Sequence, residues 1–233
     1  MRAVLCGLVL ASSAFANGAI QGTVTYERAL PKGTLQDRSS DPACGVKQVG
    51  DETLLVGPRK GLQNVLVRLE DAPPVAPGPL APVSVFQRGC SYEPRVQGAV
   101  EGQKLLIRND DPTLHNVHAY RDTRSLFNIA QPPGPRVVEK SVAPGTEVMR
   151  LKCDVHPWMA GYVIFGKSSY FAVTRPDGSF ELKDVPPGSY TLTTWHEALP
   201  RRSLGVVVLE GKAVHVHIEL SQVPAPAAGD KKG

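Results

Sequence analysis

The chain has 233 residues, 42% of them hydrophobic and 21% charged, with a formal net charge of +4 at neutral pH. So small a charge, with no basic run interleaved with aromatic residues, argues against nucleic-acid binding. No stretch approaches the roughly 20 apolar residues that a membrane-spanning helix needs, so we expect no membrane span. The 21 prolines, the 22 glycines and many short β-branched runs predict an all-β protein of one or two domains.

The first 16 residues, MRAVLCGLVLASSAFA, are typical of a secretory signal peptide. They carry an early arginine, a short apolar run and a closing Ala-Phe-Ala, which predicts cleavage after Ala16. The apolar run is too short to span a bilayer. We therefore expect a periplasmic or secreted protein.

Outside the signal peptide the chain has three cysteines, Cys44, Cys90 and Cys153. An exported protein normally meets an oxidising compartment, in which two of them can pair and one is left over. Cys153 has candidate metal ligands beside it. The predicted disulfide is therefore Cys44–Cys90.

Six segments have the length and β-branched composition of strands, separated by turn signals such as PDG at 176–178 and PPG at 186–188. They are residues 20–26, 64–70, 104–109, 161–166, 189–195 and 204–211. The segment 72–82, APPVAPGPLAP, contains five prolines, cannot form a ladder and is predicted to be a stiff connector. The tail, residues 223–233, has no apolar pattern to bury and is predicted to be disordered.

Between the connector and residue 167, two halves of similar construction each end a strand on residues that commonly bind metals. The first half delivers His115, and the second delivers Cys153, His156 and Met159 within the sequence CDVHPWM. Two imidazoles, one thiolate and a weak thioether are the donors of copper electron-transfer sites. Zinc more often has a second thiolate or a carboxylate, and the sequence offers neither at comparable spacing.

The spacing Cys-x-x-His-x-x-Met suits a tight loop that returns each side chain toward one point. Pro157 stiffens this loop by fixing its own φ. His115 must come from a different strand, so a metal would join two loops. Asn116 follows it directly, and its short amide is placed to bond the backbone beside Cys153 and orient the ligands.

At these residues the sequence resembles the cupredoxins, the small blue-copper proteins with a Greek-key β-sandwich. The resemblance covers residues 83–167 and includes His-Asn-Val-His, the CDVHPWM loop, the EGQKLLIRN strand and the APGTE turn. It implies one type 1 copper ion held by His115, Cys153, His156 and Met159, with Asn116 tying the loops. The chain departs from the pattern at Asp154, where many cupredoxins have an uncharged residue. An inward carboxylate there would favour the oxidised metal and lower the potential, whereas an outward one would only meet water.

The other histidines are expected to have ordinary roles. His118, three residues beyond His115 in an extended segment, should lie on the opposite face. His215 and His217 alternate with apolar residues and should share an exposed strand face. His196 is expected in a turn, where a pairing with Glu197 could assist docking.

Residues 170–220 resemble the carboxypeptidase regulatory-like, transthyretin-like sandwich. The matching residues are Thr174, Asp177, Gly178, Phe180, Pro187, Gly188 and Tyr190. The early strands of such a module occur before the connector, in QGTVTY and GLQNVLVRLE. We therefore expect a sandwich made of residues 17–82 and 168–222, with the copper domain, residues 83–167, inserted between them. The alternative is a tandem order in which the N-terminal strands belong to the cupredoxin.

These patterns predict an exported copper protein that passes single electrons between redox partner proteins. Electrons would move through an exposed edge of His156, with Pro157 and Trp158 as an apolar docking patch. The chain shows no nucleophile-elbow motif, phosphate loop or paired acid and base carboxylates, so we do not expect an enzyme. Two alternatives are a copper carrier, sensor or storage protein without redox traffic, and a metal-free surface binding module.

Overall fold

The computed structural model describes residues 16–30, 32–45, 49–76 and 78–221. The predicted signal peptide, apart from Ala16, and the predicted tail lie outside these residues. The regular secondary structure of the described chain is almost entirely β-strand, which confirms the all-β prediction. Its strands are β1 (Gly18–Thr25), β2 (Leu35–Gln36), β3 (Val49–Gly50), β4 (Leu66–Leu69), β5 (Val83–Arg88), β6 (Ser91–Glu93), β7 (Val96–Val100), β8 (Leu105–Asn109), β9 (His115–Arg121), β10 (Arg124–Gln131), β11 (Val137–Lys140), β12 (Val148–Lys152), β13 (Ala160–Gly166), β14 (Phe171–Val173), β15 (Ser179–Val185), β16 (Gly188–Trp195), β17 (Ser203–Val208) and β18 (Ala213–Glu219).

Helical structure is confined, within the described ranges, to one short 3₁₀ turn, η1 (Pro58–Lys60). Across the same residues, therefore, no helix has the length and apolar character needed to cross a membrane.

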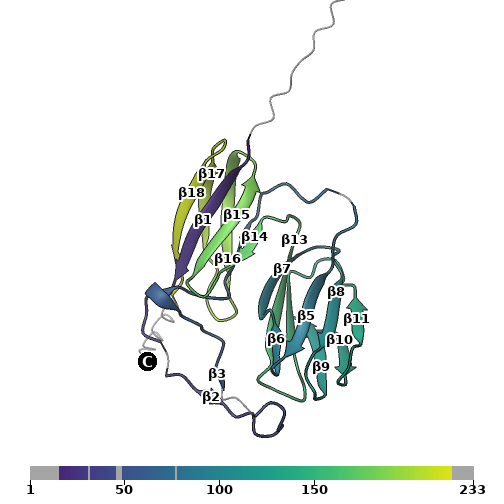
Figure 1. The fold of residues 1–233 in the computed structure, drawn as a ribbon. Helices are drawn as coiled ribbons and strands as arrows, with labels where there is room; N and C mark the ends of the chain where they lie inside the picture. The colour runs from purple at the N-terminus through teal and green to yellow at the C-terminus, as the bar shows by residue number, and fades with distance from the viewer. Residues whose placement is uncertain (1–15, 31, 46–48, 77, 222–233) are drawn as a thin grey trace, which may run out of the picture.

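One unit, called here the flanking unit, combines strands from both ends of the chain (Figure 1). One of its sheets has the order β15-β1-β18, with β1 antiparallel to β15 and parallel to β18. The other has the order β14-β4-β16-β17, with β4 antiparallel to both neighbours. Side chains such as Ile20, Val67, Leu182 and Leu192 fill a single core between these sheets. The burial of this apolar surface holds the early and late strands together.

The second unit, called the central unit, contains every strand from β5 to β13 (Figure 1, teal). Its sheets have the orders β10-β9-β12-β13-β7 and β11-β8-β5-β6. Its core includes Val85, Ile107, Val117, Leu151 and Val163, and it extends to the cysteine of CDVHPWM. The candidate ligands are therefore attached to a packed sandwich.

The six predicted strands are all present, as β1, β4, β8, β13, β16 and β17. Because β1 and β4 share sheets with β14–β18, whereas β5–β13 form separate sheets, we propose that the central unit is inserted into the flanking unit. The domain boundaries at 82 and 167, and the resemblance of the flanking unit to a carboxypeptidase regulatory-like domain, stay predictions.

One stretch expected to belong to the flanking unit instead contacts the central unit. After β1 the chain leaves its sheet and carries β2 and β3 away from it (Figure 1). Residues 37–45, called here the capping loop, are joined to the central unit by the Cys44–Cys90 disulfide, which confirms that predicted pairing. The Arg38 guanidinium in the same loop donates a hydrogen bond to the carbonyl of Gly89, at 3.1 Å. The disulfide and this hydrogen bond both hold the capping loop against the central unit.

The two units meet through close packing and a buried ion pair. A Cβ atom on Gly98 in β7 would lie 2.2 Å from the ring of Phe171 in β14, so only glycine permits this approach. The Arg95 guanidinium donates to both carboxylate oxygens of Glu197, at 2.8 and 3.0 Å, and its side chain is only 11% exposed. Bidentate geometry of this kind fixes orientation as well as contributing energy.

His196, beside this ion pair, makes protein stability depend on pH. Burial, together with the positive charge of Arg95, lowers the pKa of His196 to about 4, from 6.5. Its Nδ1 accepts a hydrogen bond from the Ala198 N–H at 3.2 Å, which the neutral ring allows. Between pH 6.5 and 4 the unfolded chain therefore binds a proton that the folded chain does not, and stability falls as the pH falls.

We expect the free energy of unfolding to decrease by about 3 kcal/mol between pH 6.5 and 4 through this residue. Urea unfolding across this range measures the loss. His196→Asn offers an acceptor in a similar place but cannot titrate. Between pH 6.5 and 4 its free energy of unfolding should therefore fall by about 3 kcal/mol less than that of the wild type. Equal pH slopes for the two proteins would show that His196 is not responsible.

Candidate metal centre

Two adjacent strands of the central unit bring the predicted ligands to one end of its sandwich. His115 is the first residue of β9, and Cys153 directly follows β12. The pairing of Lys152 with His118 places the beginning of β9 beside the end of β12. His156 lies in the turn between β12 and β13. Antiparallel pairing therefore joins two halves of the site that are far apart in the sequence.

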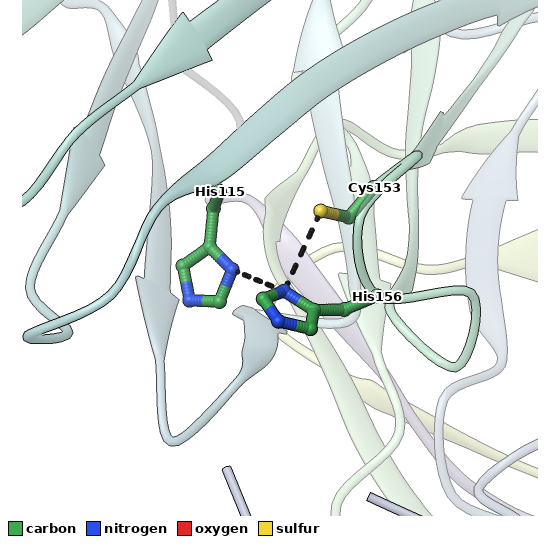
Figure 2. A group of neighbouring side chains, drawn as sticks. All are labelled: His115, Cys153 and His156. Atoms are coloured by element: carbon green, nitrogen blue, oxygen red, sulfur yellow. Dashed lines mark hydrogen bonds between the residues drawn. The ribbon is translucent and has the colours of Figure 1, made fainter. Parts of the chain in front are cut away.

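The three side chains converge on one buried point (Figure 2). Nδ1 of His115 lies 2.8 Å from Nδ1 of His156, and Sγ of Cys153 lies 3.8 Å from the same His156 nitrogen. His115 is 0% exposed, and Cys153 and His156 are each 1% exposed. Cys153 is the free cysteine of the described chain. The arrangement offers two nitrogens and one sulfur in a space closed to bulk water.

A carboxylate bonds each imidazole at Nε2, the ring nitrogen that faces away from the other two candidate ligands. Nε2 of His115 donates to Oδ2 of Asp111 at 2.9 Å, and Nε2 of His156 donates to Oδ2 of Asp41 at 3.0 Å. Burial lowers the pKa of His115, against the opposing effect of the Asp111 hydrogen bond. A lowered pKa favours the neutral imidazole, which is the form that binds metals.

These contacts determine what the site can hold. With both Nε2 atoms donating outward, both Nδ1 atoms present lone pairs to each other, and a cation between them removes the repulsion. Nitrogens bonded at about 2 Å to one ion lie at such a separation, and a sulfur bonded at about 2.3 Å also fits. The donor set of two nitrogens and one sulfur suits copper. The carboxylates face the outer nitrogens, so they do not complete a zinc-type set at this point.

Two further groups of potential ligand atoms overlap the site, but both include a cysteine of the disulfide. They are Asp41, Cys44 and His156, and Cys90, Asp111 and His115. A sulfur committed to a disulfide is not a thiolate ligand. The inner group of His115, Cys153 and His156 is therefore the candidate centre.

Asn116 bridges the two ligand loops. Its Oδ1 accepts hydrogen bonds from the backbone N–H of Asp154, at 2.7 Å, and from the Cys153 thiol, at 3.2 Å. Its Nδ2 donates to Oδ2 of Asp154 at 2.9 Å. The expected bond from this amide to the backbone beside Cys153 is thus present.

The carboxylate of Asp154 lies in a polar cluster with Asn116, His118 and Asn128. Although desolvation raises its pKa, hydrogen bonds from His118, Asn128, Lys152 and Asn116 outweigh this effect and lower the pKa to about 2. His118 lies in this cluster, with Nδ1 2.8 Å from Oδ2 of Asp154, on the side expected from its position in β9. The Asp154 side chain is partly exposed but bonds these polar groups, so it does not match the outward alternative of a carboxylate that meets only water.

The expectation that an edge of His156 reaches the surface is wrong. The sequence around CDVHPWM carries no sign of a cover, but the capping loop places Asp41 over the outer nitrogen of this ring. Trp158, the expected docking residue, is half-buried, and its Nε1–H donates to the Cys90 carbonyl at 3.1 Å. Pro157 is exposed. Its role in stiffening the loop, and the docking role of Trp158, stay predictions.

Met159 is 1% exposed and lies in the same apolar cluster as Cys153. Its backbone N–H donates to the carbonyl of His156 at 3.0 Å, which closes the turn that carries both residues. This placement is compatible with a weak thioether ligand, and that role stays a prediction.

The remaining histidines lie away from this centre. His215 and His217 are exposed on β18, as expected, and His217 contacts Thr23 and Thr25. His196 directly follows β16, in the connection to β17, as expected of a turn residue, and it is buried beside Arg95.

Sequence reasoning missed Asp41 and Asp111. Asp111 had a local signal, because it precedes His115 by four residues. Asp41 had none, since 115 residues separate it from His156.

No protein-family model matches the sequence, and no curated protein matches it. Among solved structures, a purple cupredoxin from Nitrosopumilus maritimus is similar at 21% identity and a TM-score of 0.32, over 36% of this chain and 99% of that protein. Amicyanin from Paracoccus versutus is similar at 20% identity and a TM-score of 0.31, over 42% of this chain and 96% of amicyanin. A copper-containing nitrite reductase from Thermus scotoductus SA-01 is similar at 23% identity and a TM-score of 0.31, over 40% of this chain and 25% of the reductase.

Proposed function

We propose that this protein binds one copper ion through His115, Cys153 and His156, with Met159 as a weaker fourth ligand, and carries single electrons between redox partner proteins. The proposal rests on one observation: Nδ1 of His115, Nδ1 of His156 and Sγ of Cys153 converge on one buried point. Copper in such a donor set supplies reversible one-electron chemistry.

The protein's contribution is a rigid set of donors. The hydrogen bonds at Nε2 hold both rings, and Asn116 holds the loop that carries the sulfur. Ligands that keep their positions in both oxidation states minimise the rearrangement that accompanies each transfer. Buried side chains packed at the density of a protein interior resist such rearrangement.

Because His156 is covered, a partner would have to approach elsewhere on the ligand loops. Leu114 precedes His115 and is 45% exposed, and Val155 precedes His156 and is 49% exposed. Leu114, Val155 and Pro157 are thus exposed apolar residues adjacent in the sequence to His115 or His156. A partner that packs on them would come close to the ligands without displacing the capping loop.

The same enclosure favours a second candidate function, in which the protein carries or stores copper without redox traffic. A ring that is 1% exposed offers little direct contact to a redox partner. A site shut off from water is suited to holding an ion tightly. We place either function in the periplasm or outside the cell, on the basis of the signal-like first 16 residues and the disulfide.

Copper loading of the purified protein tests the proposal. We expect one copper ion per chain, an intense thiolate-to-copper band in the visible spectrum, and its reversible loss and return on one-electron reduction and oxidation. A colourless protein that binds only cuprous ion would favour the carrier. A protein that binds no copper by metal analysis would contradict both functions and favour a metal-free binding module.

A further inference from the structure

We propose that Asp41 and Asp111 are positioning residues, which hold both ligand histidines with Nε2 protonated and Nδ1 turned toward Cys153. The placement of the protons follows from the hydrogen bonds alone. Its consequence for copper rests on the proposed function.

Asp111 has no freedom to act other than as an acceptor. Its Oδ1 accepts the Gly89 N–H at 2.7 Å, and its Oδ2 accepts the Cys90 N–H at 2.9 Å. Both donors lie in the turn between β5 and β6, where Gly89 and Cys90 have φ values of 58° and 53°. An ionised carboxylate fixed by two backbone amides can only accept from His115, so Nε2 of that ring must carry the proton.

Asp41 performs the same task for His156 from a different part of the chain. Its Oδ2 accepts the Thr113 hydroxyl at 2.6 Å as well as the His156 Nε2–H at 3.0 Å, and its Oδ1 accepts the Ala43 N–H at 2.8 Å. The capping loop that carries Asp41 is tied down three residues later at Cys44. A carboxylate with these donors leaves His156 no alternative to the Nε2–H form.

Three consequences follow for a bound ion. Each ring is fixed in orientation by a hydrogen bond on the side opposite to its lone pair. Each carboxylate makes its imidazole a stronger base and so a stronger ligand. Two negative charges behind the ligands also favour the more positive oxidised ion over the reduced one.

The first test uses metal-free protein, so that its result does not depend on copper binding. Nitrogen-15 NMR at pH 8 reports which ring nitrogen carries the proton. In the wild type we expect a protonated Nε2 in both His115 and His156. In Asp41→Ala, the His156 ring should become a mixture of the two tautomers. In Asp111→Ala, the His115 ring should do the same.

Matched controls come from neighbouring carboxylates that do not touch either ring. Asp37→Asn changes an exposed residue of the capping loop whose carboxylate accepts hydrogen bonds from its neighbour Ser39. Asp110→Asn changes the residue next to Asp111, and the Asp110 carboxylate pairs with Arg88 and Arg108. Both controls should keep the wild-type tautomers. Asp111→Asn replaces the alanine variant if loss of the turn contacts prevents folding.

The second test is the copper affinity, measured by competition with a chelator. Removing a carboxylate that accepts a hydrogen bond from a ligand imidazole should weaken copper binding by about 10–100-fold. We expect this loss in the Asp41 and Asp111 variants and an unchanged affinity in the two controls. An unprotonated Nε2 in the wild type, or unchanged tautomers in both alanine variants, would overturn the proposal. If the tautomers shift as expected but the wild type binds no copper, the positioning role stands and the copper function fails.

Discussion

Replacing Cys153 with serine should abolish the intense visible band of the copper-loaded protein and weaken copper binding by more than 100-fold. A hydroxyl is a harder and much less ionised donor than a thiol, so it replaces neither the soft bond nor its charge transfer. The loss should exceed the roughly 10–100-fold typical of residues that only support a ligand. Visible and paramagnetic-resonance spectra, together with chelator competition, measure both effects.

Two comparisons separate the loss of a ligand from the loss of a fold. Serine can still donate a hydrogen bond to Oδ1 of Asn116, so the metal-free variant should unfold at nearly the wild-type urea concentration. Met159→Leu keeps the buried volume but removes the thioether, and it should retain the visible band with a smaller loss of affinity. A wild-type spectrum in Cys153→Ser would show that Cys153 is not a ligand.

Removing the disulfide should cause a large loss of stability. Cys44 and Cys90 are separated by 46 residues, and closing a loop of that length restricts the unfolded chain by about 4 kcal/mol at 25 °C. The doubly substituted Cys44→Ser, Cys90→Ser protein should lose about that much free energy of unfolding in urea. Substituting both positions leaves no new unpaired thiol at residue 44 or 90, so Cys153 stays the free cysteine of the described chain, as in the wild type.

The same double variant should loosen the capping loop over the metal centre. Without the bond at Cys44, Asp41 is held only by weaker contacts such as the Thr113 hydroxyl. Backbone amides in the capping loop should then exchange hydrogen faster, while those of β9 and β12 keep their protection. Stability within about 0.5 kcal/mol of the wild type, or unchanged exchange in the loop, would contradict this account of the disulfide.

Much of the metal centre could be predicted because its signals are local. Cys153, His156 and Met159 lie in one seven-residue loop, and strand patterns on either side place that loop at the end of a sandwich. The pairing of Cys44 with Cys90 followed from counting, once Cys153 was set aside for the metal. One prediction that failed, an exposed His156, concerned the accessibility of the ring, which depends on the segments of the chain that cover it.

The amino-acid sequence by itself determined the all-β class, the six strands recognised from their composition, the disulfide and the set of candidate ligands. Periodicity, turn residues and short spacings are properties of neighbouring residues, so they can be read directly along the chain. Only the tertiary structure showed that the capping loop crosses to the central unit and that Asp41 and Asp111 accept hydrogen bonds from the two histidines. These contacts depend on packing and hydrogen bonding between distant segments, and no local pattern encodes which partner a buried group finds.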